Sequence, residues 1–193
     1  MQIQSRASSA RQLELLERAY TYLLAHGLAS LSLRPLAQAI GSSPRVLLFL
    51  FGSKEGLVQA LLARARTAQL ELLSQIARTD NTDDFPTVVR GVWHWLVAKQ
   101  HRQLLGFWLE TYAQSLVDPK GPCADFARKT VEDWLQLLAV RQGAAVRRSG
   151  AGAMESALAL AVLRGALLDL LATGDEERTT AVVEAYLSRI PQR

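Results

Sequence analysis

The chain has little of what stabilises secreted proteins. Cys123 is the only cysteine among 193 residues, so no intramolecular disulfide can form. The first residues contain no apolar run of the kind found in a signal peptide. We therefore expect the protein to be located in the reducing cytoplasm.

Residues with catalytic or metal-binding chemistry are also scarce and scattered. The three histidines, His26, His94 and His101, are too dispersed in the sequence to indicate one site. The sequence contains no Ser/His/Asp or Cys/His arrangement, no glycine loop for phosphates and no spacing typical of metal ligands. We expect no enzymatic activity, no metal and no cofactor. Cys123 could be a redox-sensitive thiol or a small packing residue.

Long uninterrupted apolar runs are absent too. The most apolar segment, residues 154–171, is interrupted by Glu155, Arg164 and Asp169 before it reaches the roughly 20 residues that span a bilayer. It predicts a helix buried between protein surfaces and no membrane contact. Glycine and proline form no long linker, and no segment alternates with period two, so we expect one all-α protein.

Helical spacing and capping residues predict about nine helices. Ser32, Ser43 and Ser53 are suitable N-caps for the second, third and fourth helices. The expected ranges are about 9–26, 33–40, 44–51, 54–78, 85–100, 101–117, 123–142, 154–172 and 175–189. This pattern predicts a three-helix head at residues 1–52 and a larger helical body at residues 53–193.

The second and third predicted helices form a helix-turn-helix. Leu36 and Ile40 lie on one face, Gly41 supplies a turn, and Leu47 and Phe51 lie four residues apart on the next helix. Such a turn projects the second helix outward. Residues 1–66 contain 8 basic and 3 acidic side chains, whereas residues 67–193 contain 14 and 15. The positive charge lies in the head, as expected of a part that meets phosphates, although a solvated basic face would also account for it.

From about Leu13 to Ala63 the sequence resembles the TetR family of transcriptional regulators. The matching segments are Ser32-Leu33-Arg34-Pro35-Leu36-Ala37, Ile40-Gly41-Ser42-Ser43, Leu47-Leu48 with Phe51, and Ser53-Lys54-Glu55-Gly56-Leu57. The resemblance implies a homodimer with DNA-binding heads, a pocket for an unidentified small-molecule effector, and dimerisation through the last two long helices. Its implied role is a ligand-responsive regulator, most simply a repressor, that binds an inverted repeat in double-stranded DNA.

The resemblance also assigns the DNA-binding residues. Arg45 is the candidate for bidentate contact with guanine, and Lys54 for contact with a phosphate at a helix N-terminus. Arg34 suits either a phosphate or a base edge. The full predicted set is Arg34, Ser43, Pro44, Arg45, Val46, Leu48 and Lys54.

The recognition helix departs from the family pattern by being unusually apolar. Leu48 stands where a tyrosine is usual, Leu50 where histidine or tyrosine is common, and Val46 where threonine is common. Val46 or Leu48 could contact thymine methyl groups. Alternatively, Leu48, Phe49 and Leu50 pack against the head or a neighbour, or the head has lost DNA binding. The last case describes a ligand-binding or protein-interaction dimer with a vestigial head.

Aromatic residues concentrate in three helices of the predicted body. They suit an apolar pocket with few polar anchors, although such stripes are also typical of a protein core. The predicted ligand-binding residues are Trp93, Leu96, His101, Phe107, Trp108, Tyr112 and Trp134.

The last two predicted helices have more apolar surface than one chain is expected to cover. The segment from Ala157 to Leu171 is apolar around much of its circumference, which favours a four-helix interface with a second subunit over burial within one body. The predicted interface residues are Leu160, Leu163, Leu167, Leu170, Val183 and Tyr186.

Overall fold

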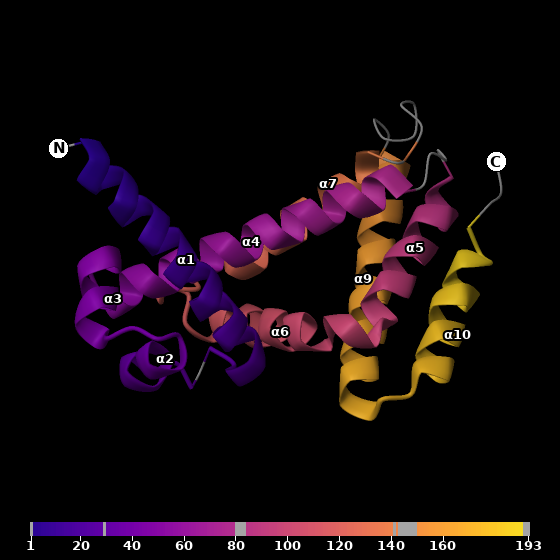
Figure 1. Cartoon of the computed structure of the whole chain (residues 1–193). Coiled ribbons are helices and arrows are strands. Elements are labelled where there is room, and N and C mark those ends of the chain that lie inside the picture. The colour runs from indigo at the N-terminus through magenta and orange to yellow at the C-terminus, as the bar shows by residue number, and fades with distance from the viewer. Residues whose placement is uncertain (1, 29, 80–83, 141, 143–149, 191–193) are drawn as a thin grey trace. The chain divides into compact units, whose positions relative to one another are not determined.

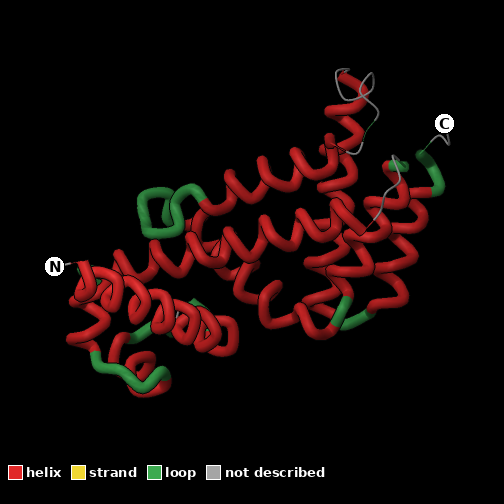
Figure 2. The backbone as a smooth tube through the Cα atoms, turned by 45° about the horizontal axis from the view of Figure 1, so that its top comes forward, coloured by secondary structure: helices red, strands yellow, loops and turns green. Residues whose placement is uncertain are grey.

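The computed structural model describes residues 2–28, 30–79, 84–140, 142 and 150–190, with backbone only for 2–8 and 72–79. Over these residues the fold is all-helical, and Figure 2 shows no strand in them. The α-helices are α1 (Gln2–His26), α2 (Leu33–Ala39), α3 (Pro44–Phe51), α4 (Lys54–Thr79), α5 (Phe85–Val97), α6 (Arg102–Val117), α7 (Phe126–Val140), α9 (Gly150–Thr173) and α10 (Glu176–Leu187), with a 3₁₀ turn η1 (Lys99–His101) before α6 (Figure 1).

Most predicted helices are present, and their differences lie at the ends. Helix α1 begins at Gln2 rather than near residue 9, and α9 begins at Gly150 rather than near residue 154. Ser32 occupies the N-cap position of α2, but its side chain makes no capping hydrogen bond. The expected caps at the starts of α3 and α4 are formed by Ser43 and Ser53, and Asp175 caps α10.

The structure divides the chain differently from the predicted boundary after residue 52. The first compact unit comprises residues 1–69 and 103–127, and the second comprises residues 70–102 and 128–193. The reason is that the apolar core of the head continues beyond α3. It takes in Leu57 and Leu61 of α4, Phe107 of α6 and Cys123 of the turn before α7.

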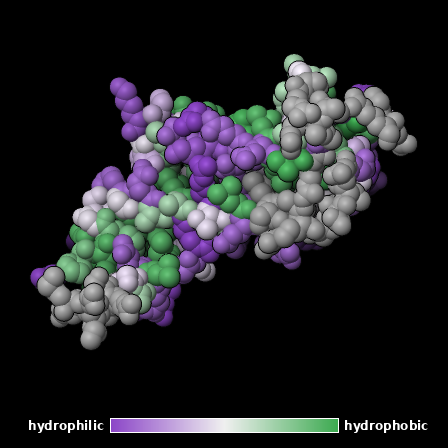
Figure 3. All heavy atoms as spheres, turned by 90° about the horizontal axis from the view of Figure 1, so that it is seen from above, coloured by the Kyte–Doolittle hydropathy of each residue, from purple (hydrophilic) through white to green (hydrophobic). Residues whose placement is uncertain are grey.

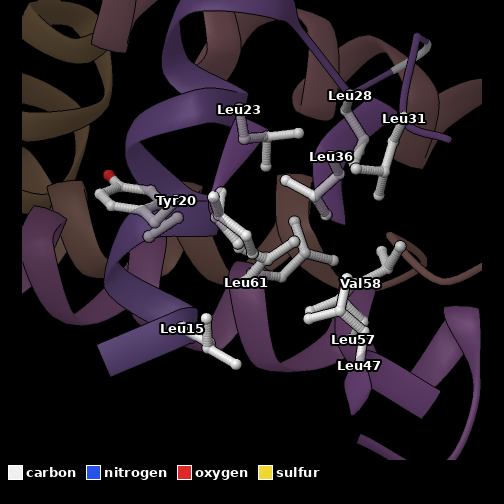
Figure 4. Close-up of a cluster of buried hydrophobic side chains, with 14 of the residues drawn as sticks. Leu15, Tyr20, Leu23, Leu28, Leu31, Leu36, Leu47, Leu57, Val58 and Leu61 are labelled. Atoms are coloured by element: carbon white, nitrogen blue, oxygen red, sulfur yellow. The ribbon is translucent and has the colours of Figure 1, made fainter. Parts of the chain in front are cut away.

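In the first unit, α1 to α4 pack around one buried leucine cluster (Figure 4). Leu36 of α2, Leu47 of α3 and Leu57 of α4 have no exposed surface. Leu15 and Leu23 of α1 are equally buried, so each of the four helices contributes at least one fully buried leucine. This core fixes the position of α3 within the head.

In the second unit, α9 packs against α5 and α10 (Figure 1). A bidentate ion pair joins Arg90 of α5 to Glu184 of α10 at 2.7 and 2.9 Å. Arg178 of α10 holds Asp169 near the end of α9 in the same way, at 2.6 and 2.7 Å. By length and composition α9 could span a membrane. Soluble core helices share that composition, and one face of α9 is buried in this unit.

Candidate nucleic-acid interface and effector site

The turn between α2 and α3 is fixed by its backbone hydrogen bonds. The N–H of Ser42 donates to the carbonyl of Ala37 at 2.8 Å, and the N–H of Gly41 donates to Gln38 at 3.3 Å. This pattern is a Schellman motif, whose central residue has a positive φ. Gly41 has φ +67°, which glycine adopts without steric cost.

Two side chains of α1 hold the ends of the helix-turn-helix. The guanidinium of Arg18 donates to the carbonyl of Ile40 at 3.3 Å, where α2 ends. The amide of Gln12 donates to the carbonyl of Leu50 at 2.9 Å, near the end of α3. Helix α1 therefore serves as the support on which α2 and α3 are held at a fixed angle.

Helix α4 begins in close contact with the end of α3. The hydroxyl of Ser53 accepts the N–H of Gly56 at 3.0 Å and caps the helix. A Cβ at Gly56 would overlap the carbonyl oxygen of Phe51, so this position requires glycine. Hydrogen bonds from its own backbone N–H and from the Ser53 hydroxyl lower the pKa of Glu55 below its usual value. Lys54, the first residue of α4, is exposed beside this cap.

The predicted DNA-binding residues lie mostly at the surface. Arg34 on α2, Arg45 on α3 and Lys54 on α4 are exposed. Within the described ranges, the side chains of Arg34 and Arg45 make no hydrogen bond or ion pair. Ser43 and Pro44 are half-buried at the start of α3, where the Ser43 hydroxyl accepts the N–H of Val46 at 3.3 Å.

The exposed apolar side chains of α3 include one that the predicted DNA-binding set lacks. Val46 is 39% exposed, Leu48 is 40% exposed, and Phe49 is 82% exposed. Leu50 and Phe51, by contrast, pack against the head core. The alternative that Phe49 packs into its own head is therefore wrong. Helical spacing carried the signal, because Phe49 lies four residues after Arg45 and so shares its face.

The predicted ligand-binding residues are divided between the two units. Phe107, Trp108 and Tyr112 lie on α6 in the first unit. Phe107 is buried in the head core, with its ring edge-on to Tyr20 at a centroid distance of 6.3 Å. Aromatic spacing could not show that α6 contributes to the core of the head. Contact of Phe107 with a ligand stays a prediction.

Trp108 and Tyr112 remain the better candidates on α6. Their rings lie 5.1 Å apart at a tilt of 34°. The indole N–H of Trp108 is buried and finds no acceptor among the described residues. An unpaired buried donor typically costs about 1–3 kcal/mol, so a ligand that offers an acceptor would gain from pairing with it.

In the second unit, Trp93 belongs to the core. Its side chain has no exposed surface, and its indole N–H donates to the hydroxyl of Thr180 at 3.0 Å. Contact of Trp93 with a ligand stays a prediction. Leu96 and Trp134 are almost fully buried. His101 is half-buried, stacked on Trp95 at 3.9 Å, and its Nδ1 lies 2.8 Å from the carbonyl oxygen of Trp95.

The predicted dimer residues are mostly interior to the second unit. All but Tyr186 are buried within one chain, namely Leu160, Leu163, Leu167, Leu170 and Val183. The sequence did not reveal this burial for the α9 residues, because α9 is apolar around most of its circumference. Contact of these five residues with a second subunit stays a prediction.

The outward side of α9 and α10 forms an open apolar groove of about 700 Å³. Met154, Leu158 and Val182 line it and are each about half exposed or more. Tyr186 also lines the groove, and burial, with a smaller contribution from Glu155, raises its pKa to about 12. We call these four residues and their surroundings the α9–α10 groove.

Cys123 is buried in the core of the first unit. Burial raises the pKa of its thiol above the usual value, and Glu110 and Asp118 add to this effect. The reactive thiolate is disfavoured, so Cys123 acts as a small packing residue. Among the residues that the structure describes, no group of three or more His, Cys, Asp or Glu side chains could hold a metal ion.

Comparison with known proteins bears on the head and on the fold separately. Residues 15–61 match the family model described as "Bacterial regulatory proteins, tetR family". No curated protein sequence matches the chain.

Solved structures resemble the whole chain. A TetR-family transcriptional regulator from Agrobacterium tumefaciens superposes with a TM-score of 0.71 at 19% identity, covering 96% of this chain and 100% of the other. The multidrug-binding protein EbrR, solved with imidazole, gives 0.62 at 23% identity, covering 95% and 93%. NalD of Pseudomonas aeruginosa, the secondary repressor of the MexAB-OprM multidrug efflux pump, gives 0.53 at 14%, covering 95% and 96%. At these identities the likeness concerns the fold.

Proposed function

We propose that this chain, whose head at residues 15–61 matches the TetR family of transcriptional regulators, is a homodimeric repressor. It binds an inverted repeat in DNA and responds to an apolar small molecule. The observation that carries the proposal is the way in which α3 is held and exposed. This helix is held rigidly by α1 and the core, and it presents Arg45 to solvent with no partner in the described part of the chain. Repression takes place where the DNA is, so we place the protein in the cytoplasm.

The charge of the head supports contact with DNA. Arg34, Arg45 and Lys54 are exposed cations on three successive helices of one unit. In helix-turn-helix proteins the N-terminal residues of the second helix meet base edges, while other cations meet phosphates. Arg45 then contributes base preference, and Lys54 contributes affinity that does not depend on sequence.

The α9–α10 groove supports dimerisation. Its apolar residues come from both helices, and Glu155 and Arg189 supply opposite charges among the residues that line it. In a two-fold interface the same surface meets itself, so an acidic and a basic residue on one face can pair across the axis. We propose that Met154, Leu158, Val182 and Tyr186 contact the second subunit, and that two recognition helices then lie about 34–36 Å apart.

Trp108 and Tyr112 support the effector response. Their tilted rings and the unpaired indole N–H offer apolar surface and one hydrogen-bond donor. The descriptions of EbrR as a multidrug-binding protein and of NalD as a repressor of a multidrug efflux pump favour a small-molecule effector. An effector that binds one conformation of the protein better than another would shift the population of DNA-competent heads.

The first test is selection of bound duplexes from a random DNA library with the purified full chain at one moderate salt concentration. We expect enrichment of an inverted repeat, and affinity that falls steeply as salt rises. Folded protein that enriches no sequence would contradict the repressor proposal. It would favour the alternative, a ligand-binding or protein-interaction dimer with a vestigial head, which the exposed apolar side chains of α3 allow.

A second test separates the roles of two cations. Arg45→Ala should reduce discrimination at one base pair, with a typical loss of about 1–3 kcal/mol. Lys54→Ala should weaken binding to all sequences alike and reduce the salt dependence by about one phosphate contact. Identical binding profiles for the two variants would refute this division.

The effector proposal has its own test. We expect apolar compounds in a thermal-shift screen to raise the melting temperature of the protein and to change its affinity for the selected operator. Trp108→Phe keeps an aromatic six-membered ring but removes the indole N–H donor, and should reduce the response to compounds that carry an acceptor. Compounds that change neither stability nor DNA affinity would remove the support for an effector site.

A further inference from the structure

The outward face of α3 has two residues at its centre. An α-helix turns by about 100° per residue, so Arg45 and Phe49, four residues apart, point in nearly the same direction. That direction is opposite to Leu47, which is fully buried in the head. Val46 and Leu48 lie on either side of the pair and are both partly exposed. The face is therefore one cation next to one large aromatic ring, with a branched apolar side chain on each side.

Exposure of this apolar surface to water is unfavourable. The charged side chains around it indicate which kind of partner covers it. Phe49 is the most exposed of the large hydrophobic side chains on α3, at 82%. Arg45 shares its face, and Arg34 and Lys54 are exposed on the neighbouring helices. A surface that combines cations with apolar side chains suits a partner that combines negative charge with apolar groups. A purely apolar protein surface would leave these cations unpaired.

The major groove of DNA provides that combination at thymine. Its edge shows one hydrogen-bond acceptor and a C5 methyl group, and apolar side chains recognise the methyl group directly. Uracil has the same hydrogen-bonding edge without the methyl group. Resting on the function proposed above, we propose that Phe49, flanked by Val46 and Leu48, is a specificity-determining residue that reads thymine methyl groups in the operator.

The helix geometry also sets where the thymine lies. Phe49 is about 6 Å further along the helix axis than Arg45, since each residue rises about 1.5 Å. Base pairs are spaced by about 3.4 Å. The thymine read by Phe49 therefore lies at most about two base pairs from the guanine contacted by Arg45, because a helix inclined to the groove advances less than its own length.

The test uses the operator obtained by selection and replaces each thymine in turn by deoxyuridine. At the thymine within two base pairs of the Arg45 guanine, loss of one methyl contact should weaken binding about fourfold for one half-site. Substitution in both half-sites should weaken it by tenfold or more. Thymines elsewhere in the operator should show no change, and they serve as internal controls for altered DNA shape.

The matched protein variant is Phe49→Ala, which removes an exposed side chain and leaves the head core intact. It should bind the thymine operator about tenfold more weakly and lose the difference between thymine and uracil. Its salt dependence should equal that of the unmodified protein, because no phosphate contact is lost. Leu116→Ala is the control, since Leu116 is also an exposed apolar residue of the first unit but lies on α6. It should change neither property.

The outcomes separate this inference from the proposed function. If no operator is selected, the repressor proposal fails, and this inference fails with it. If an operator is selected but uracil binds as well as thymine at every position, only the reading of methyl groups is overturned. A variant Phe49→Ala that binds with unchanged affinity, or that keeps its sensitivity to uracil, would equally overturn the role of Phe49.

Discussion

Helices α3 and α9 are both rich in apolar residues, but their exposed apolar side chains have different surroundings. On α3, Phe49 shares its face with Arg45, whose side chain has no partner among the described residues. On α9, Met154 and Leu158 face an apolar groove that continues onto α10. Figure 3 shows hydrophobic side chains in separate patches among hydrophilic ones on the face that it presents.

The difference shows that exposed apolar area alone does not identify a partner. The groups around the patch decide what can cover it without burying an unpaired charge. Cations beside the apolar face of α3 favour DNA. Among the residues that line the α9–α10 groove, Glu155 and Arg189 carry opposite charges, which favours a second copy of the chain.

The sharpest contrast lies between the two sides of α3. Leu47→Ala removes a fully buried side chain from the head core and should lower the free energy of unfolding by about 2–5 kcal/mol. Leu48→Ala, one residue further on, should lower it by less than about 1 kcal/mol, because Leu48 is on the exposed face. Urea unfolding of both variants at equal protein concentration measures the difference. Equal losses would show that α3 does not have a buried and an exposed side.

For the α9–α10 groove, Leu158→Glu together with Val182→Glu should dissociate the dimer. Each substitution occurs twice in a two-fold interface and places charge where apolar contact is expected, so the dimer dissociation constant should rise by about a hundredfold or more. Sedimentation equilibrium measures it. Leu116→Glu, an exposed position in the first unit, should leave the dimer unchanged. A monomeric unmodified protein at micromolar concentration would contradict the dimer outright.

A substitution at the junction between α3 and α4 should have a smaller effect on stability. Gly56→Ala should destabilise the head by about 1–3 kcal/mol, since its Cβ overlaps the carbonyl oxygen of Phe51 and overpacking of this kind has that cost. Gly106→Ala on α6 is the matched control, because nothing lies within contact distance of its Cβ. That variant should gain up to about 1 kcal/mol from the better helix propensity of alanine. Thermal unfolding measures the change in stability of both variants, which should have opposite signs. A stabilised Gly56→Ala variant would disprove the close approach of residue 56 to the carbonyl oxygen of Phe51.

The smallest effect concerns the ion pair between α5 and α10. The hydrogen bonds from Arg90 lower the pKa of Glu184 below its usual value. The stability that this pair contributes is therefore fully present above the ordinary pKa of a glutamate, and is lost as pH falls through the lowered value. Both side chains are about 40% exposed, so the contribution at pH 7 should be below about 1 kcal/mol.

Glu184→Gln tests this pair. The variant should be slightly less stable than the unmodified protein at pH 7, and the difference should vanish in strong acid. Urea unfolding at several pH values provides the comparison. A difference that does not change with pH would mean that the pair contributes through packing rather than through charge.

The predictability of the two regions from sequence differs for a physical reason. In the head, Ser43, Gly41 and the spacing of Leu47 and Phe51 are local signals, and each predicted a structural feature that is present. Phe49 was missing from the predicted set although its spacing from Arg45 was in the sequence. Its exposure was not, because an apolar side chain on a short helix can lie on either face.

Tertiary contacts decided the remaining assignments. Phe107 belongs to the head core because α6 is part of the first unit, and Trp93 is sealed by its hydrogen bond to Thr180. No local pattern carries either fact, since both depend on residues more than 80 positions apart in the sequence. The same holds for Leu163, whose side of α9 is buried by α5 and α10.

The amino-acid sequence by itself determined the helices, the turn of the head, its positive charge and the match of residues 15–61 to the TetR family model, because capping, helical periodicity and motif spacing are local properties. Only the tertiary structure decided which apolar side chains are core and which are surface. Burial depends on which helices pack together. When a helix is apolar on every side, its sequence does not indicate which side faces the neighbouring helices.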